Sequence, residues 1–193
     1  MLLKYLGEGG NALPASLKCA VAVSVPCDLR GSAVKLTRRS NLIYMARFIR
    51  YMRRKLKLKS KAHLAPDGFD FDRLNRLRNF PEWDAVVTAR LHGFKDVEDY
   101  WEQSASIRYL DGIQIPTLLI TAQDDPFFST SCYPVAQAER SRHFWLESPR
   151  HGGHVGFVSS AGNGEYWQEQ RISAFLQEHV GQKLEVAACL SVS

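Results

Sequence analysis

The sequence lacks several features that mark whole classes of protein. No apolar run among its 193 residues approaches the ~18 residues that span a bilayer, and no apolar signal segment follows Met1. We therefore predict a chain without a transmembrane helix, and we expect it in the cytoplasm. Its four cysteines are far apart and form no C-x-x-C pair. This spacing argues against zinc and redox motifs and favours reduced, structural thiols.

Acidic residues are absent between Arg38 and Lys61, where ten lysines or arginines occur. Apolar residues recur in this stretch at helical spacing, at Leu42, Met45, Ile49, Met52 and Leu56. The pattern favours a packed amphipathic helix with a solvated basic face. Weak contact with an anionic membrane surface is a second interpretation. Nucleic-acid binding is the weakest, because no nucleic-acid-binding motif accompanies the charge, and we expect no nucleic-acid partner.

Three stretches are predicted to be strands. Residues 19–26 form a continuous apolar, β-branched run, which is typical of a buried strand, a second buried strand is predicted in 113–126, and a third strand is predicted in 142–153. Helical segments separate and follow them, which is an α/β order, and parallel strands are its natural consequence. Three strands make a thin sheet, since the average sheet has ~5–6 strands. We therefore expect further strands upstream of Met1.

Helices are predicted around these strands. The first covers residues 1–10, with Leu2, Leu3 and Leu6 on one side. Another covers residues 164–180, with an inward face of Trp167, Ile172, Phe175, Leu176 and Val180. Residues 28–93 are predicted to form a mostly helical insertion, and residues 181–193 a loosely ordered tail. The first helix has no N-cap residue, so we interpret it as cut through its beginning.

Ionisable residues follow the second and third predicted strands. Asp124 and Asp125 come after one strand, and His151 and His154 lie in the glycine-rich loop after the other. Catalytic groups in open α/β sheets gather at these strand ends, and a hydrolase triad finishes with an acid and then a histidine. The acid would fix the imidazole tautomer, so that the histidine could take a proton from a hydroxyl group.

Plainer interpretations stay open on the residues alone. Two aspartates after a strand can form only a turn or a cap, and a histidine beside glycine can be a surface loop residue. A metal site is less favoured, because H-x-x-H with two intervening glycines is not a usual ligand pattern. We expect neither a metal nor a cofactor.

A serine nucleophile is not evident in the sequence. No G-x-S-x-G elbow occurs, and the only glycines four apart, Gly152 and Gly156, bracket His154. Ser24 lies at the end of the first predicted strand, but it has no flanking glycines that would allow the sharp turn of a nucleophile elbow. Cys27 and Cys132 have no activating context, so all three are predicted to be structural.

Four segments resemble the YheT-type candidate esterases, a branch of the α/β-hydrolase superfamily related to animal ABHD lipases. They are MLLKYLGEGG (1–10), FPEWDAVVTARLHGFKDVEDYW (80–101), IQIPTLLITAQDDPFF (113–128) and HGGHVGF (151–157). The resemblance runs to about Leu176. It implies an α/β fold that is the C-terminal part of an α/β-hydrolase fold. Residues 1–180 would form a partial hydrolase domain, with residues 28–93 as its helical lid.

The resemblance also implies roles for individual residues. His154 would be the catalytic base and Asp125 the acid, with Asp124 as the reserve choice and His151 a loop residue beside the site. In relatives a segment like LLKYLGEGG follows the serine elbow, which would place the nucleophile before Met1. Two residues depart from the family pattern. Trp101 stands where relatives more often have tyrosine, and Ala105 stands where they more often have serine. These departures bear on substrate fit.

The implied function is a serine-type carboxylic ester hydrolase, either an esterase or an acylglycerol lipase. Its substrate would be a small-molecule or lipid ester. The 193-residue chain itself is expected to be inactive, because it holds the acid and base without the nucleophile. The alternative is an inactive hydrolase fragment or a binding protein.

Overall fold

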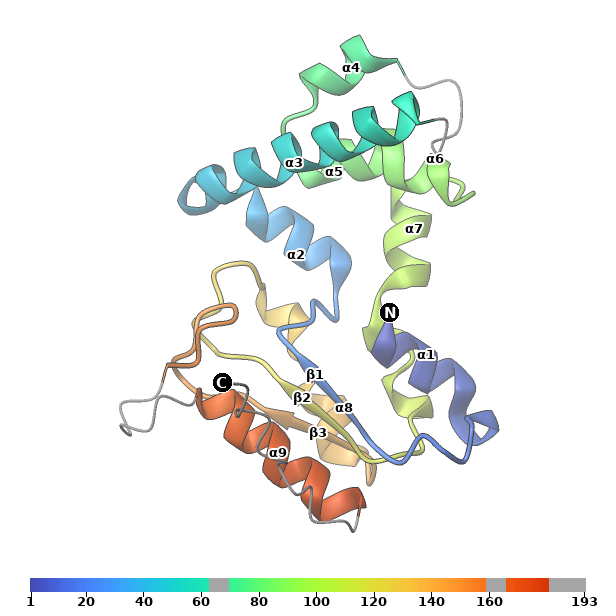
Figure 1. Ribbon diagram of the computed structural model, residues 1–193, viewed down its shortest axis with the longest axis vertical. Helices are drawn as coiled ribbons and strands as arrows, with labels where there is room; N and C mark the ends of the chain where they lie inside the picture. The colour runs from blue at the N-terminus through green and yellow to red at the C-terminus, as the bar shows by residue number, and fades with distance from the viewer. Residues whose placement is uncertain (63–69, 159–165, 181–193) are drawn as a thin grey trace, which may run out of the picture.

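The computed structural model describes residues 1–62, 70–158 and 166–180. The tail expected at 181–193 lies outside the described residues. The chain forms two regions, one with strands and flanking helices and one with helices alone (Figure 1). Among the described residues, no helix is long and apolar enough to cross a membrane.

The sheet has three strands in the order β1-β2-β3, and both pairs are parallel, as predicted. The strands are β1 (Ala20–Val23), β2 (Thr117–Ile120) and β3 (Phe144–Glu147). Each is shorter than the predicted stretch. β1 ends where Ser24 takes a φ of 50°, a backbone conformation that a strand cannot continue. The central strand β2 is buried along its whole length.

Helices cover both faces of this sheet: α1 (Leu2–Gly9) and α8 (Val135–Arg140) lie on one face, and α9 (Trp167–Val180) on the other. Side chains of β2 alternate between the faces. Leu119 packs against the α1 side, while Leu118 and Ile120 pack against the α9 side. The sheet therefore has a core on each face.

The predicted inward faces of two helices need correction at their ends. In α1, Leu3 and Leu6 are buried, but Leu2, the first residue of the helix, is 40% exposed. In α9, Phe175 is buried and Trp167 and Ile172 pack against it, but Val180, the last helical residue, is 38% exposed.

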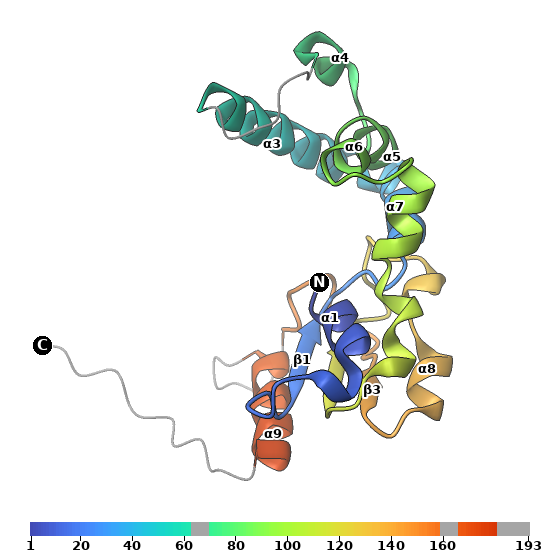
Figure 2. The same ribbon diagram turned by 90° about the vertical axis from the view of Figure 1, so that its right-hand side faces the viewer.

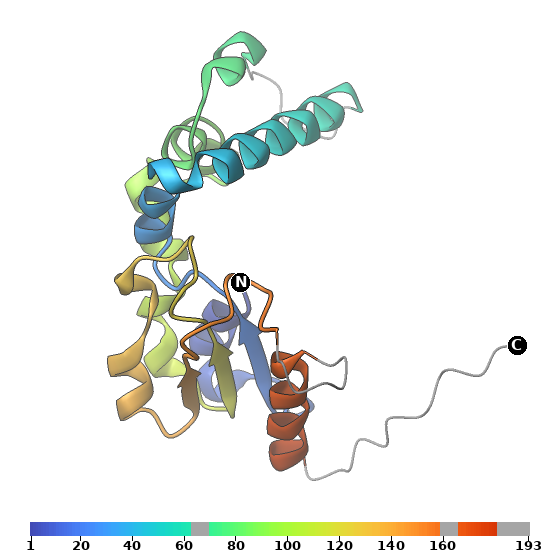
Figure 3. The same cartoon turned by 90° about the vertical axis from the view of Figure 1, so that its left-hand side faces the viewer.

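The helical region follows β1 and returns to β2. Its helices are α2 (Leu29–Leu36), α3 (Leu42–Lys61), α4 (Phe71–Arg76), α5 (Phe80–Trp83), a π-helical turn (Asp84–Thr88), α6 (Ala89–Leu91) and α7 (Val97–Ser104). Short 3₁₀ turns occur at Gly10–Ala12, Arg39–Asn41, Ser106–Arg108, Leu110–Gly112 and Thr130–Cys132. Figure 2 shows α7 running from this region toward the sheet, and Figure 3 shows α2 leading from β1 toward α3.

The predicted amphipathic helix corresponds to α3. Met45, Ile49 and Leu56 are buried and Met52 is partly buried, whereas Leu42 is 54% exposed at the start of the helix. The buried face joins Phe127 and Phe128, which follow β2, in one apolar cluster. The helical region is thus packed onto the loop that leaves the central strand.

Candidate active site

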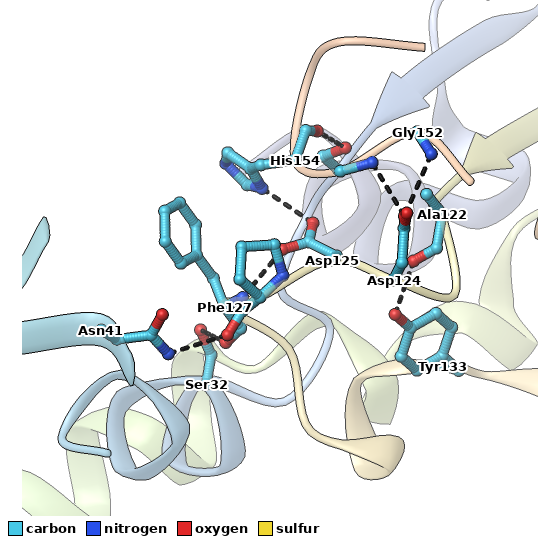
Figure 4. A network of polar contacts seen from close by, with 12 residues as sticks. Ser32, Asn41, Ala122, Asp124, Asp125, Phe127, Tyr133, Gly152 and His154 are labelled. Atoms are coloured by element: carbon cyan, nitrogen blue, oxygen red, sulfur yellow. Dashed lines mark hydrogen bonds and ion pairs between the residues drawn. The ribbon is translucent and has the colours of Figure 1, made fainter. Parts of the chain in front are cut away.

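The loops after β2 and β3 bring the predicted acid and base together. β2 and β3 are parallel neighbours, so their carboxyl ends lie at the same edge of the sheet. Asp124 and Asp125 follow the end of β2, and His151 and His154 follow the end of β3. Figure 4 shows the two loops facing each other.

His154 and Asp125 form a direct pair. The imidazole Nδ1 lies 2.8 Å from Asp125 Oδ2, and the other carboxylate oxygen accepts a hydrogen bond of 2.9 Å from the backbone N–H of Phe127. The Asp125 side chain is fully buried, while that of His154 is 34% exposed. A carboxylate fixed by a backbone amide thus orients an imidazole that solvent can still reach.

Aromatic rings and the helical region hold this pair in place. The Phe127 ring centroid lies 4.7 Å from that of the His154 ring, and the Phe128 ring stands edge-on at 5.5 Å. Ser32 Oγ donates to the carbonyl of Phe127, and Asn41 Nδ2 donates to the carbonyl of Pro126 at 2.8 Å (Figure 4). The acid loop is therefore anchored to α2 and to the turn before α3.

Asp124, the reserve choice for the acid, contacts a different histidine. Its Oδ2 lies 3.5 Å from Nδ1 of His151, whose side chain is 89% exposed. Its Oδ1 accepts hydrogen bonds from the backbone N–H groups of Gly152, at 3.0 Å, and Gly153, at 2.8 Å. Asp124 therefore anchors the backbone of the histidine loop.

Both glycines suit this anchored loop. Gly153 has a φ of 59°, in the left-handed region. A Cβ atom on Gly152 would lie 2.7 Å from the Phe157 ring and 2.8 Å from the Cβ of Ala122, so a larger residue would displace the loop. The glycine-rich sequence signalled a tight loop, but it did not indicate which carboxylate anchors it.

We expect Asp124→Ala to speed amide hydrogen exchange at Gly152 and Gly153. The Gly153 N–H bond lowers the pKa of the exposed Asp124 carboxyl, and Gly152 and His151 lower it further. The folded pKa is thus below the unfolded one, so the anchoring is fully present above about pH 4 and is lost as pH falls through the lowered value.

Exchange measured by NMR from pH 7 to pH 2 checks this prediction. Asp124→Asn is the matched variant, because its amide oxygen can still accept from a glycine N–H without titrating. It should keep part of the protection and lose the acid-dependent component. Unchanged exchange in Asp124→Ala would contradict the anchoring role.

Ser24 belongs to the site, a placement that the sequence reasoning missed. It is buried, and its hydroxyl donates to the backbone carbonyl of His154. Nothing in VSVP signalled this contact, because its partner is far away in the sequence.

The thiols of Cys27 and Cys132 are poor nucleophiles. Burial raises the pKa of Cys27 to about 11 and also raises the pKa of Cys132, whose Sγ donates to the carbonyl of Asp28.

A cavity of about 290 Å³ opens beside the pair and is lined by His154 and Ser24. Its volume is near the lower end of the ~300–1,000 Å³ range of ligand pockets. Most of its wall is apolar, with Leu29, Leu36, Phe48, Phe80, Phe127 and Phe128. Among the described residues, no cluster of three or more His, Cys, Asp or Glu side chains is arranged to hold a metal ion.

Comparison with known proteins gives several relatives, although no protein-family model matches the chain. It is 29% identical to YheT of Escherichia coli (strain K12), a candidate esterase by its name, over 184 residues. These residues cover 95% of this chain and 53% of YheT.

Two further relatives are named as lipid hydrolases. The chain is 28% identical to phospholipase ABHD3 of Mus musculus, over 82% of this chain and 38% of that protein. It is also 28% identical to the monoacylglycerol lipase of Saccharomyces cerevisiae, over 92% of this chain and 40% of that protein. The chain spans about half the length of these curated relatives, or less. The predicted resemblance is thus confirmed: over most of its length the chain is similar to esterases and lipases of the α/β-hydrolase superfamily, and its parallel sheet and flanking helices form part of that fold.

Proposed function

We propose that this chain supplies the acid and the base of a serine-type carboxylic ester hydrolase. The observation that carries the proposal is the 2.8 Å contact between His154 Nδ1 and the buried Asp125 carboxylate, at the wall of an apolar cavity. Asp125 would be the acid and His154 the base. The names of the relatives support an ester substrate.

The chemistry follows from the hydrogen bond. An ionised carboxylate only accepts, so Asp125 selects the tautomer in which Nδ1 carries the proton. Nε2 is then free of a proton and can take one from a serine hydroxyl as its oxygen attacks the ester carbonyl. The imidazolium next donates that proton to the leaving alkoxide, and Asp125 stabilises the positive charge without taking the proton. Water repeats the cycle on the acyl-enzyme.

The apolar cavity would hold the hydrocarbon part of the ester beside His154. Phe48 and Phe80 come from the helical region, while Phe127 comes from the loop after β2. Residues 28–93 would thus act as the lid over a small-molecule or lipid ester. Excluding water from this space strengthens the hydrogen bonds made at the reacting carbonyl.

We propose that the serine lies outside this sequence. The chain has no G-x-S-x-G motif. Within the described residues, no serine or cysteine side chain is hydrogen-bonded to the His154 ring, and Ser24 and Ser32 donate to backbone carbonyls instead. Loss of the serine costs about a factor of 10⁶ in turnover, and loss of one oxyanion donor about 10²–10³. The 193-residue chain alone should therefore not hydrolyse esters detectably.

The DNA immediately upstream of the Met1 codon tests this proposal. An in-frame segment that encodes a G-x-S-x-G elbow next to the first helix would support a complete serine hydrolase. A stop codon or an unrelated sequence there would contradict it. That result would favour the alternative of an inactive hydrolase fragment or a binding protein.

The outer face of α3 supports weak contact with an anionic membrane surface. Ile43, Tyr51 and Leu58 are 84%, 65% and 58% exposed, and exposed arginines such as Arg47 and Arg54 stand between them. One helix face thus combines apolar side chains with positive charge, as interfacial helices do. Such a face could bring the lid to lipid substrate.

We expect the chain to bind phosphatidylserine vesicles in a salt-sensitive manner. Each basic residue near an anionic surface contributes about 1 kcal/mol, so the double variant Arg47→Glu/Arg54→Glu should bind at least about tenfold more weakly. Arg142→Glu, an exposed site beside β3, is the matched control and should bind like the unaltered chain. Sedimentation with vesicles measures this, and equal binding to neutral vesicles would rule out the charge-based contact.

A further inference from the structure

The lining of the cavity beside His154 also includes two polar residues of the helical region, Asp84 and Tyr100. Asp84 is the first residue of the π-helical turn, and Tyr100 lies on α7. Both belong to the helical region, and neither takes part in the acid-base chemistry. π-Helical turns occur frequently at functional sites, where they reposition side chains.

Asp84 is held in place by two donors. Thr88 Oγ1 donates to Oδ1 at 2.8 Å, and the indole Nε1–H of Trp101 donates to Oδ2 at 2.9 Å. Each carboxylate oxygen can accept two hydrogen bonds, so each keeps one acceptor site. Asp84 is only 9% exposed, and burial raises the pKa of its carboxyl although both donors lower it. A buried carboxylate with unused acceptor capacity gains from a further donor.

Tyr100 supplies the complementary group. Burial raises the pKa of its phenol, and the nearby charge of Asp84 raises it further. The hydroxyl therefore stays protonated and able to donate. Among the described residues it makes no hydrogen bond, although its ring packs at 5.3 Å against that of Phe94. Asp84 and Tyr100 thus contribute an acceptor and a donor to the lining of one cavity, close enough for the charge of one to affect the other.

We propose that Asp84 and Tyr100 bind the hydroxyl group of an otherwise apolar ligand. An alcohol donates and accepts at one oxygen, so it can donate to the Asp84 carboxylate and accept from the Tyr100 hydroxyl. The phenylalanine and leucine side chains of the wall then cover the hydrocarbon part. This inference deepens the proposed function, on which it rests: the substrate is an ester that also carries a free hydroxyl group.

Binding of two matched probes to the 193-residue chain tests the inference without any hydrolysis. The probes are 1-hexanol and 1-methoxyhexane, which differ in whether the oxygen carries a hydrogen or a methyl group. The indole N–H signal of Trp101 in NMR titrations is a local readout, because this group donates to Asp84. A hydrogen bond to a charged group corresponds to about a tenfold or greater change in affinity, so hexanol should bind about tenfold more tightly.

Two variants then assign the two hydrogen bonds to their residues. Tyr100→Phe removes a donor from which the oxygen of either probe can accept, so it should weaken the binding of both probes by about threefold to tenfold and leave the preference for hexanol at about tenfold. Asp84→Asn should abolish most of it. Tyr5→Phe and Asp72→Asn are exposed substitutions of the same chemistry outside the cavity and should leave the preference unchanged.

Several results would overturn the inference. They are equal affinity for the two probes, no binding of either, or unchanged affinity for both probes in Tyr100→Phe. Tighter binding of hexylammonium than of hexanol would identify a cation site instead. These outcomes concern ligand binding alone. If hexanol and 1-methoxyhexane bound equally, the hydroxyl site would be ruled out, while the proposed ester hydrolysis would still be tested separately by activity of the complete protein.

Discussion

Replacing His154 by alanine is expected to lower kcat for ester hydrolysis by about six orders of magnitude in the serine hydrolase that we propose to contain this chain. The variant removes the only imidazole that contacts the buried Asp125 in the described part of the chain. Without it, no group takes the proton from the serine or returns one to the leaving alkoxide. Turnover of p-nitrophenyl butyrate measures the effect.

His151→Ala is the matched control for that experiment. His151 lies in the same loop, but its side chain is 89% exposed and contacts Asp124. We expect this variant to keep kcat within a few-fold of the unaltered enzyme. Comparable losses in the two variants would show that loop integrity, and not the His154 imidazole, limits the reaction.

Asp125→Asn should lower kcat by about 10⁴-fold, as the same substitution of the triad carboxylate does in a serine protease. The asparagine oxygen can keep the bond from the Phe127 N–H, but its NH₂ group then faces Nδ1 of His154. That donor favours the tautomer with the proton on Nε2, which cannot act as a base. Substrate binding should change little, so the effect should fall on kcat and leave KM nearly constant.

Asp124→Asn tests whether the effect is specific to one of the two neighbouring acids. Asp124 contacts the glycine amides and His151, so its loss of charge should reduce kcat far less than the Asp125 substitution. An equal or larger loss in Asp124→Asn would transfer the acid role to the reserve choice.

The sequence predicted the features that depend on local pattern. The pattern of apolar residues located β1, β2 and β3, and helical spacing located the buried residues Met45, Ile49 and Leu56 of α3. The strand ends were predicted too long, because apolar residues such as Ala122 remain buried after the ladder has ended. Periodicity reports burial more directly than it reports hydrogen bonding.

The features that it did not predict depend on contacts between distant residues. Asp124 and Asp125 have the same sequence surroundings, and only the fold shows that Asp125 meets His154 while Asp124 meets the glycine amides. Asp84 was not singled out as a candidate residue, because the hydrogen bonds from Thr88 and Trp101 cannot be read from the sequence. Ser24 was likewise placed beside His154 only by the fold.

The site of labelling by a fluorophosphonate probe tests the central claim most directly. The 193-residue chain and the same chain extended by its in-frame upstream residues would each be treated and analysed by peptide mass spectrometry. We predict that only the extended chain is labelled, on a serine before Met1, and that His154→Ala abolishes the labelling. Labelling of a serine within the 193 residues, or labelling that persists in His154→Ala, would contradict the account.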